Sequence, residues 1–223
     1  MKVELIDSSG GDLSVVNSAR VSFDKESDYE VVNAVGQERS YYLADRDIKL
    51  VNYLAKHRHD TPFRHNFVQL RCQVPLFLAR QLMKHQAGLT WNEESRRYVD
   101  HLPEFHYPEE WRARPEKSIK QGSAGIVDCN DNLVSVYEDY IRKAEQLYTD
   151  LLELNVAPEM ARMVLPQSMM VNFIWSGNLL AFYHVYSLRS GHGAQQEAVD
   201  FAELLKKAIE PEFPVSWKAL EGR

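Results

Sequence analysis

Apolar and polar positions alternate most clearly over residues 66–74, where the chain reads NFVQLRCQV. The apolar members fall at every second position from Val68 to Val74, and glutamine or arginine fills the positions between them. A period of two predicts a β-strand with one buried face. Pro75 ends the pattern and suits the first turn of a helix, which we expect over residues 76–85.

Helical spacing of apolar residues marks several other segments. Residues 45–57 show this spacing, and Asp45 is placed to cap the start of the helix. A long amphipathic helix is predicted over 131–154, and two further helices over 170–189 and 194–209.

The shorter patterns complete the predicted fold. Residues 3–6 (VELI) form a short strand, residues 12–23 a short helix or turn followed by an extended piece, and residues 24–40 a polar loop. No internal repeat or linker divides the chain, so a single domain is expected over residues 1–223. The fold class that follows is α+β, with a small sheet and many helices.

Composition excludes some functions and narrows others. Of the 223 residues, 44% are hydrophobic and 26% charged, which is ordinary for a soluble globular protein. Without a membrane-spanning apolar run or a signal-peptide pattern, the chain is expected to be cytoplasmic, with no membrane partner. The net charge of −6 disfavours binding to nucleic acid, so an anionic ligand needs a local cluster of cations.

One such cluster lies in and before the segment 84–98, KHQAGLTWNEESRRY. Arg80 and Lys84 are four residues apart on the predicted helix and therefore share a face, and Arg96 and Arg97 follow. These cations outnumber the two glutamates of the segment, which indicates a phosphate site. The alternative is a basic helix face that only contacts solvent.

Two other segments carry candidate chemistry. Residues 56–65, KHRHDTPFRH, hold three histidines, and His59-Asp60 is a pattern of HD-type metal-dependent phosphohydrolases. The alternative there is a solvated helix end. Arg189 follows an apolar helix, where an arginine is usually paired or bound to a ligand, and Glu197 is the available partner for a salt bridge.

Taken in chain order, these segments resemble the flavin-dependent thymidylate synthases. The signature of that family is matched in residues 84–98 at His85, Asn92, Glu93, Ser95, Arg97 and Tyr98. Further segments resemble the family in the same order: SARVSF (18–23), HDTPFRH (59–65), PLFLARQ (75–81), ARMVLP (161–166), WSGN (175–178) and LRSGHGAQQE (188–197). Lys84 and Gln86 depart from the family by replacing two arginines of the signature.

The resemblance implies a fold, a reaction and an assembly. The fold is a small, mostly antiparallel sheet packed with several helices. The reaction converts dUMP to dTMP, with methylenetetrahydrofolate as the one-carbon donor and NADPH reducing a bound FAD. The assembly is a homotetramer whose active sites draw on several subunits, and no metal takes part.

The resemblance also implies roles for individual residues. Arg189 and Ser95 are the implied catalytic residues, with Ser95 interpreted as a hydrogen-bond donor to the phosphate of dUMP. The implied dUMP-binding residues are Gln81, Glu93, Ser95, Arg97, Arg162 and Arg189. The implied FAD-binding residues are Ser22, His59, Lys84, His85, Gln86, Asn92 and His184.

The cysteines agree with a flavin route. Cys72 lies on the apolar face of the predicted strand, and Cys129 has acidic neighbours that would raise its pKa, so neither is expected to be a reactive thiolate. Two alternatives stay open: an HD-type phosphohydrolase, and a nucleotide-binding homologue without catalytic activity.

Overall fold

The computed structural model describes residues 1–32, 40–99, 101–115, 122–128, 130–191 and 193–223. A four-stranded antiparallel sheet in the order β1-β4-β6-β5 forms its centre. A two-stranded sheet of β2 and β3 is separate from it. The strands are β1 (Lys2–Ser9), β2 (Glu30–Val32), β3 (Ser40–Tyr42), β4 (Phe67–Pro75), β5 (Leu89–Glu93) and β6 (Met170–Gly177).

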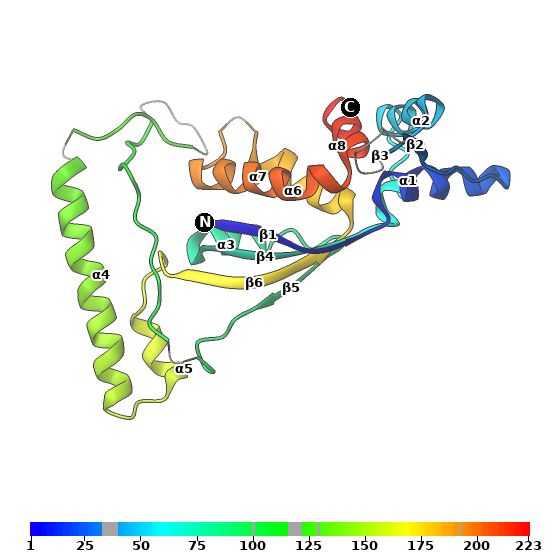
Figure 1. Ribbon diagram of the computed structural model, residues 1–223. Helices are drawn as coiled ribbons and strands as arrows, with labels where there is room; N and C mark the ends of the chain where they lie inside the picture. Colours follow the sequence, from blue (N-terminus) through cyan, green and yellow to red (C-terminus); the bar gives the residue numbers. More distant parts are fainter. Residues whose placement is uncertain (33–39, 100, 116–121, 129, 192) are drawn as a thin grey trace.

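Eight helices of the described residues surround the central sheet: α1 (Gly11–Arg20), α2 (Asp45–Lys56), α3 (Leu76–Leu82), α4 (Asn130–Glu153), α5 (Pro158–Ala161), α6 (Leu179–Arg189), α7 (Gln196–Ile209) and α8 (Pro214–Glu221). Figure 1 shows α6 and α7 lying along one face of the sheet, with α8 beside α2 at one end of the molecule. The long helix α4 stands at the opposite end, beyond the ends of the strands (Figure 1). The expected α+β fold with a small antiparallel sheet is therefore confirmed.

The two inner strands carry the core-facing side chains. In β4 every second residue from Val68 to Val74 is buried, as the alternating pattern predicts. In β6, Val171, Phe173 and Trp175 are buried in the same way. The Trp175 ring lies 5.4 Å from those of Trp91 and Phe182, which ties strands β5 and β6 to helix α6.

Helix α6 is apolar on almost every side because it lies between other elements. Six of its eleven residues are buried, from Leu179 to Val185. Asn178 caps the helix, since its side chain accepts a hydrogen bond of 3.0 Å from the Ala181 amide. The exposed residues of α6, His184, Ser187 and Leu188, are three and four residues apart and therefore mark one exposed flank, and Arg189 is partly exposed at the end of the helix.

The predicted elements were partly wrong. The helices expected over 45–57, 131–154 and 194–209 are confirmed as α2, α4 and α7, but residues 170–177 form strand β6 and not a helix. Met170, Phe173, Ile174 and Trp175 leave no clean alternation, and a short apolar run does not distinguish a buried strand from a buried helix.

Smaller errors lie at the ends of elements. Residues 12–23 are helical throughout, because the 3-10 turn Val21–Phe23 follows α1 where an extended piece was expected. Residues 30–32 of the expected loop form β2, and residues 33–39 lie outside the described residues. Ala44 occupies the N-cap of α2, so Asp45 lies in the first turn and does not cap.

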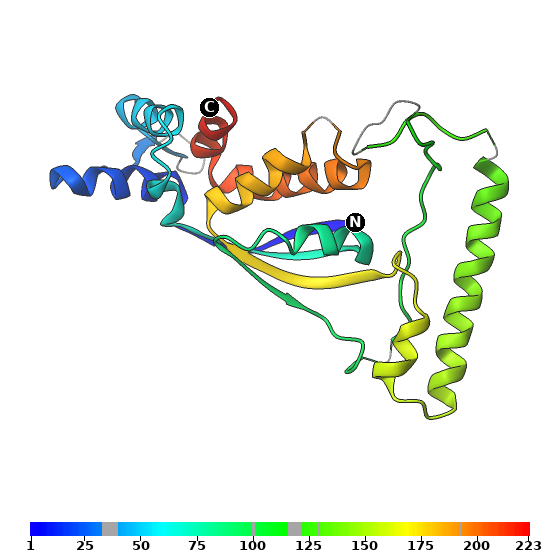
Figure 2. The ribbon, with the colours of Figure 1, turned by 180° about the vertical axis from the view of Figure 1, so that it is seen from behind.

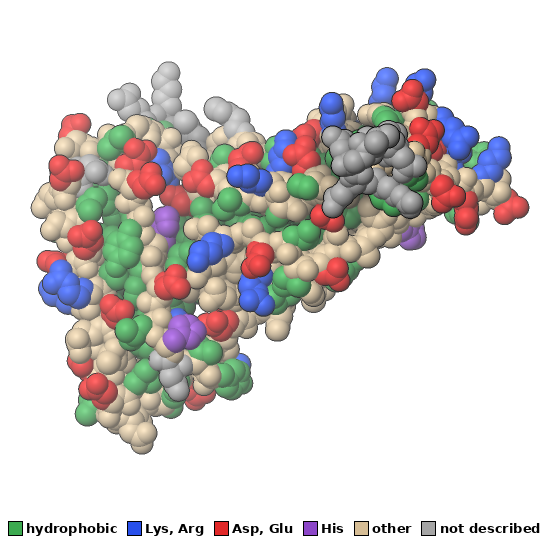
Figure 3. Space-filling view, in the orientation of Figure 1, with side chains coloured by type: hydrophobic (Ala, Val, Ile, Leu, Met, Phe, Trp, Pro, Cys, Tyr) green, Lys and Arg blue, Asp and Glu red, His purple; other side chains and the backbone are tan. Residues whose placement is uncertain are grey.

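Helix α4 presents apolar side chains to solvent. Val136, Tyr140 and Leu147 are each about half exposed, and their spacing of four and seven residues places them on one side of the helix. Figure 2 shows from behind that α4 lies away from the sheet, and Figure 3 shows apolar side chains among charged ones on that flank. Across the described residues, no helix combines the length and apolarity needed to span a membrane.

Candidate active site

A cavity of about 570 Å³ opens where β5 ends and β6 begins. Glu93, Ser95 and Arg97 come from the chain at and after the end of β5, Arg162 from the 3-10 turn after α5, and Arg80 from α3. Arg80, Arg97 and Arg162 are exposed, so a local cation cluster exists in a chain of net charge −6. The full lining is Leu76, Arg80, Glu93, Glu94, Ser95, Arg96, Arg97, Arg162, Met163, Leu165, Gln167, Met169, Met170 and Val171.

Ser95 and Arg97 form one hydrogen-bonded unit at this cavity. Arg97 Nε donates to Ser95 Oγ at 3.1 Å, and the Arg97 guanidinium carbon lies 5.0 Å from the centre of the Tyr98 ring. Because the serine oxygen accepts from arginine, its own O–H is left to donate elsewhere. A hydroxyl donor beside a guanidinium fork suits the oxygens of a phosphate group.

The two glutamates of the cavity differ in what they contact. Glu94 accepts a hydrogen bond of 3.3 Å from Asn172 Nδ2 and lies 3.4 Å from His101 Nε2. Glu93 accepts a hydrogen bond of 3.3 Å from Trp91 Nε1. Burial raises the pKa of Glu93, and the bond from Trp91 partly offsets that rise. Glu93 is thus the carboxyl group better placed to contact a hydroxyl of a ligand.

Arg189 belongs to a second cluster. Its Nε donates to His85 Nε2 at 3.1 Å, and its Nη2 donates to the carbonyl oxygen of Gln81 at 3.1 Å. The side chain of Gln81 donates to Gln195 Oε1 at 2.7 Å. Arginine is always a donor, so His85 Nε2 accepts and the neutral ring carries its proton on Nδ1. Arg189 is held in place by these contacts and is only partly exposed.

Helix α3 connects the two clusters. Arg80 and Gln81 are neighbours on this helix, but Arg80 lines the cavity while Gln81 bonds to Gln195 at the start of α7. Within one chain, Glu93, Ser95, Arg97 and Arg162 therefore come together, and Arg189 and Gln81 lie outside their cavity.

Three of the residues expected to contact FAD lie near the exposed flank of α6. His184 Nε2 is 3.0 Å from Arg223 Nη2, and Arg223 Nη1 donates to Asp60 Oδ1 at 2.9 Å, next to His59 in the chain. The charge of His184 also acts on the neighbouring His85, because it contributes to the lowered pKa of that ring.

The other expected FAD residues are scattered in one chain. Lys84 and Gln86 are exposed in the turn after α3. Asn92 lines a different cavity of about 440 Å³, together with Arg71. Ser22 is exposed in the 3-10 turn after α1 and does not line the cavities of about 590, 570, 330 or 440 Å³.

Comparison with known proteins decides the family. A family model described as "Thymidylate synthase complementing protein" matches residues 4–215. The chain belongs to this family. It is similar to proteins named flavin-dependent thymidylate synthase from Kosmotoga olearia and Thermus thermophilus, at 33% and 31% identity over 219 residues each. These matches cover 97% and 98% of this chain, and 88% and 75% of the relatives.

Solved structures agree with this family assignment. The fold is similar to that of a UMP/dUMP methylase, PolB from Streptomyces cacaoi, bound with 5-Br dUMP. The TM-score is 0.82 at 30% sequence identity, and the match covers 99% of this chain and 94% of the other. A second structure of PolB, bound with 5-Br UMP, gives a TM-score of 0.83 at 29% identity.

Membership in the thymidylate synthase complementing proteins also bears on the alternatives. Among the described residues, no group of three or more His, Cys, Asp or Glu side chains is arranged to hold a metal, and Asp60 is paired with Arg223.

Two predicted contacts were wrong. Arg189 does not form the salt bridge considered with Glu197, because Glu197 pairs with Arg112 beside another cavity of about 590 Å³. Lys84 does not share a helix face with Arg80, since α3 ends at Leu82.

The contribution of Arg80 to the cavity was only partly foreseen, and that of Gln167 was missed. Arg80 stood out in the sequence as part of a cation cluster for phosphate but was not among the implied dUMP- or FAD-binding residues, and it lines the cavity. Gln167 lines this cavity and the neighbouring one of about 590 Å³. No sequence pattern marks Gln167, because its position depends on the turn that precedes β6.

The environment of His85 predicts how this cluster responds to pH. Burial lowers the pKa of His85 from its usual 6.5, and the charges of Arg189 and His184 lower it further. A histidine with a lowered pKa stabilises the folded state fully above pH 6.5, and this contribution is lost as the pH falls below that value. We expect the ring signals of His85 in NMR spectra to titrate with a midpoint below 6.5.

Two variants make this measurement specific. His85→Asn identifies the signal by its absence, and Arg189→Ala should move the His85 midpoint upward by removing one of the two neighbouring charges. A midpoint at or above 6.5 in the unsubstituted protein would contradict the contact between Arg189 Nε and His85 Nε2.

Proposed function

We propose that this chain is a flavin-dependent thymidylate synthase. It methylates dUMP to dTMP, with methylenetetrahydrofolate as one-carbon donor and NADPH as the source of reducing equivalents for FAD. The names of the relatives from Kosmotoga olearia and Thermus thermophilus support this activity. The dUMP analogue bound to PolB supports a uridylate as substrate.

The observation that carries the proposal is the shared cavity of Glu93, Ser95, Arg97 and Arg162. In the proposed complex, Arg97 and Arg162 neutralise the phosphate of dUMP and the Ser95 hydroxyl donates to one of its oxygens. Glu93 then accepts from a sugar hydroxyl. One hydroxyl and two guanidinium groups together supply enough donors for the several oxygens of a phosphate group.

Arg189 and Gln81 bind the uracil end of dUMP in this proposal. The guanidinium of Arg189 is oriented by His85 and by the Gln81 carbonyl, and it has donors left for a ring oxygen. A fixed positive charge there stabilises negative charge on a ring oxygen in the electron-rich form of the uracil, from which C5 attacks the one-carbon unit. Arg189 is the residue we assign to catalysis, with Ser95 supporting it through the phosphate.

The described cysteine does not fit a thiol mechanism. Cys72 is 1% exposed, and burial raises the pKa of its thiol far above neutrality. Cys129 lies outside the described residues. The reducing chemistry of the reaction comes from the flavin when FAD is bound.

The flank of α6 fits a flavin nucleotide. His184 and His85 each accept a hydrogen bond from an arginine, which leaves an Nδ1–H on each ring to donate to a ligand. Arginines near these rings favour a ligand with phosphate groups. The residues that we propose to hold FAD are Ser22, His59, Lys84, His85, Gln86, Asn92 and His184.

We further propose a homotetramer with active sites shared between chains. Two features support it: the residues for phosphate and for uracil lie in separate clusters of one chain, and α4 exposes Val136, Tyr140 and Leu147 on one side. Pairing these surfaces between copies would bury apolar area and complete the site. Residues 1–223 are proposed to act as one domain, in the cytoplasm.

UMP is a second candidate substrate. PolB is named a UMP/dUMP methylase and has been solved with 5-Br UMP as well as 5-Br dUMP. The two nucleotides differ only by the ribose 2′-hydroxyl, so both should be assayed.

The test is direct. The purified protein loaded with FAD should show a flavin absorption spectrum, and it should form dTMP from dUMP only when methylenetetrahydrofolate and NADPH are both present. Cys72→Ala serves as a control and should retain turnover. Absence of dTMP from flavin-loaded protein would contradict the proposal, and flavin binding without turnover would favour a non-catalytic homologue. Metal-dependent release of phosphate from nucleotides would revive the phosphohydrolase.

A further inference from the structure

Arg223 makes three contacts that fix its guanidinium group near His184. Its Nη1 donates to Asp60 Oδ1 at 2.9 Å, its Nη2 lies 3.0 Å from His184 Nε2, and its central carbon lies 5.1 Å from the centre of the Tyr183 ring. The side chain is only 12% exposed. These contacts connect the end of α8 to α6 and to the turn after α2.

The contact with Arg223 decides which nitrogen of His184 carries the proton. Arginine has only donors, so His184 Nε2 accepts and the neutral ring has its proton on Nδ1. Burial lowers the pKa of His184, and the positive charges of Arg223 and Arg64 lower it further, while Asp60 raises it. His184 therefore stays neutral near pH 7 and presents an N–H donor.

Arg58 approaches the same place with an unusual backbone. Its φ angle is 56°, which is in the left-handed region that side chains other than glycine rarely adopt. The position ends α2, where His59 N donates to the Leu54 carbonyl oxygen at 2.9 Å, and glycine is the usual residue at such a helix end. Glycine would end the helix without this conformational cost, so we expect the side chain of Arg58 to have a further role.

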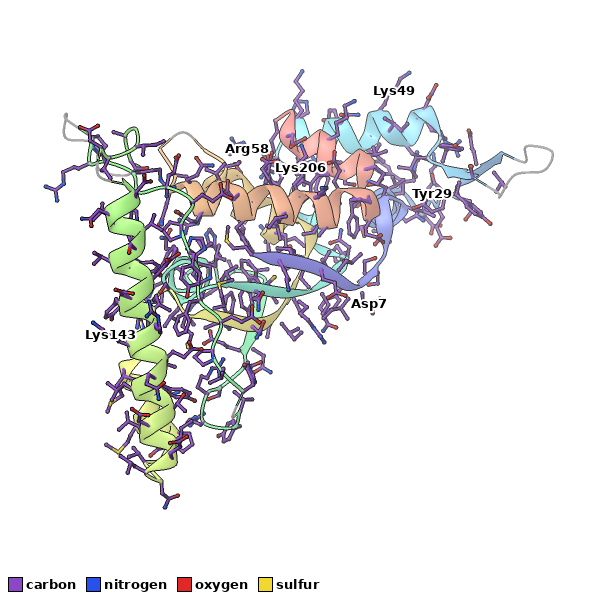
Figure 4. The ribbon with its side chains drawn as sticks, turned by 60° about the vertical axis from the view of Figure 1, so that its left-hand side comes forward. Asp7, Tyr29, Lys49, Arg58, Lys143 and Lys206 are labelled. Carbon is purple, nitrogen blue, oxygen red and sulfur yellow. The ribbon has the colours of Figure 1, made fainter. Side chains whose placement is uncertain are left out.

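These residues surround one cavity of about 330 Å³, lined by Arg58, Tyr183, His184, Ser187, Leu188 and Arg223. Its lining contains two arginines and no acidic residue, and the nearby carboxylate of Asp60 is already paired with Arg223. Figure 4 labels Arg58, which projects past α8 on the side of the molecule that carries α6 and α7. The cavity is thus positive in a protein of net charge −6.

We infer that this cavity is a phosphate-binding site in which Arg58 and His184 contact the anion and Arg223 positions His184. The inference rests on the proposed function for the identity of the ligand, which is the diphosphate of FAD. The phosphate of dUMP is assigned to the separate cavity around Ser95 and Arg97. Gln86 has no charge where the family signature carries arginine, so the flavin phosphates require cations from elsewhere.

The experiment compares FAD with riboflavin, which lacks both the diphosphate and the adenosine of FAD. The binding of each to the flavin-free protein is followed by flavin fluorescence. Arg58→Gly should weaken FAD binding by about 10- to 100-fold, as expected for a lost hydrogen bond to a charged group. Arg223→Ala should weaken FAD binding as well, because His184 is then no longer held to donate to the phosphate. Riboflavin binding should change by less than about twofold, because the lost contacts involve only phosphate.

Control variants separate binding from folding. Arg58→Gly relieves the left-handed backbone, so its Tm should equal or exceed that of the unsubstituted protein while FAD binding weakens. Lys49→Ala removes an exposed cation of α2, the helix that precedes Arg58, and should leave FAD binding unchanged. Figure 4 also labels Lys49. Arg223→Lys should recover part of the affinity, and Arg223→Ala should raise the pKa of His184 in NMR titrations.

Several results would overturn the inference. Unchanged FAD binding in Arg58→Gly shows that the cavity does not hold the diphosphate, and equal losses of FAD and riboflavin show a structural role only. Weakened NADPH binding with intact FAD binding assigns the cavity to the other dinucleotide. If the unsubstituted protein binds neither flavin, the proposed function fails. Inorganic pyrophosphate then tests the cavity alone, and it must raise the Tm of the unsubstituted protein and not that of Arg58→Gly.

Discussion

Replacing Arg189 with alanine is expected to lower the rate of dTMP formation by about 10²- to 10³-fold, the usual cost of removing one group that stabilises charge in a transition state. The guanidinium of Arg189 is held by His85 Nε2 and the Gln81 carbonyl oxygen, both at 3.1 Å, so its direction is fixed before substrate binds. The measurement is the initial rate at saturating dUMP, together with the flavin absorbance per chain.

The flavin content separates catalysis from cofactor binding. Arg189→Ala should keep its FAD, because the proposed role of Arg189 is toward uracil. Arg189→Lys keeps the charge but loses the planar fork that meets both partners, so it should recover only part of the rate. Arg46→Ala removes an exposed arginine of α2 and serves as a matched control. Normal turnover in Arg189→Ala would exclude its catalytic role.

A mixture of two defective chains is expected to regain activity. Arg189→Ala damages the uracil cluster, which consists of Arg189, His85 and Gln81. Arg97→Ala removes one cation of the phosphate cavity around Ser95 and should raise the KM for dUMP by about 10- to 100-fold. If each site combines the uracil cluster of one chain with the phosphate cavity of another, about a quarter of the sites in randomly mixed tetramers carry neither defect. Both chains are co-expressed with different tags, and assembled protein carrying both tags is assayed at low dUMP.

The control for this test uses two defects in one cluster. His85→Ala and Arg189→Ala both damage the uracil cluster, so their mixture should produce few intact sites and little activity. Activity of the first mixture no higher than the sum of its parents would show that a single chain supplies both clusters. The shared-site arrangement would then be wrong, although the proposed reaction would stand.

The sequence predicted secondary structure best where apolar residues mark one buried face over the full length of an element. Strand β4 has apolar residues at every second position and charged or amide residues between, and it is correctly predicted over nearly its full length. Strand β6 was predicted to be part of a helix because three consecutive apolar residues, Phe173, Ile174 and Trp175, hide the alternation of its buried positions. Strand β5 was missed because its alternation, with Leu89 and Trp91 on one side and Thr90 and Asn92 on the other, is only four residues long.

The residues of the candidate site also differ in how well the sequence predicts them. Glu93, Ser95 and Arg97 are close in the chain, so the motif alone identifies them as a local cluster. That Arg162 joins them in one cavity was implied only by resemblance, and the fold brings it there through the turn before β6. Arg58 and Arg223 carry no sequence signal, because their meeting depends on the packing of α8 against α2 and α6.

By itself, the sequence determined the fold class, the family and the types of side chain available for phosphate and uracil. These follow from local periodicity and from motifs whose members lie within one turn or one strand of each other. Only the tertiary structure decided which of these side chains share a cavity: Arg223 pairs with Asp60 and His184, and Arg189 with His85 and not with Glu197. The physical reason is that strand pairing and helix packing join residues far apart in the chain, and no local pattern encodes those contacts.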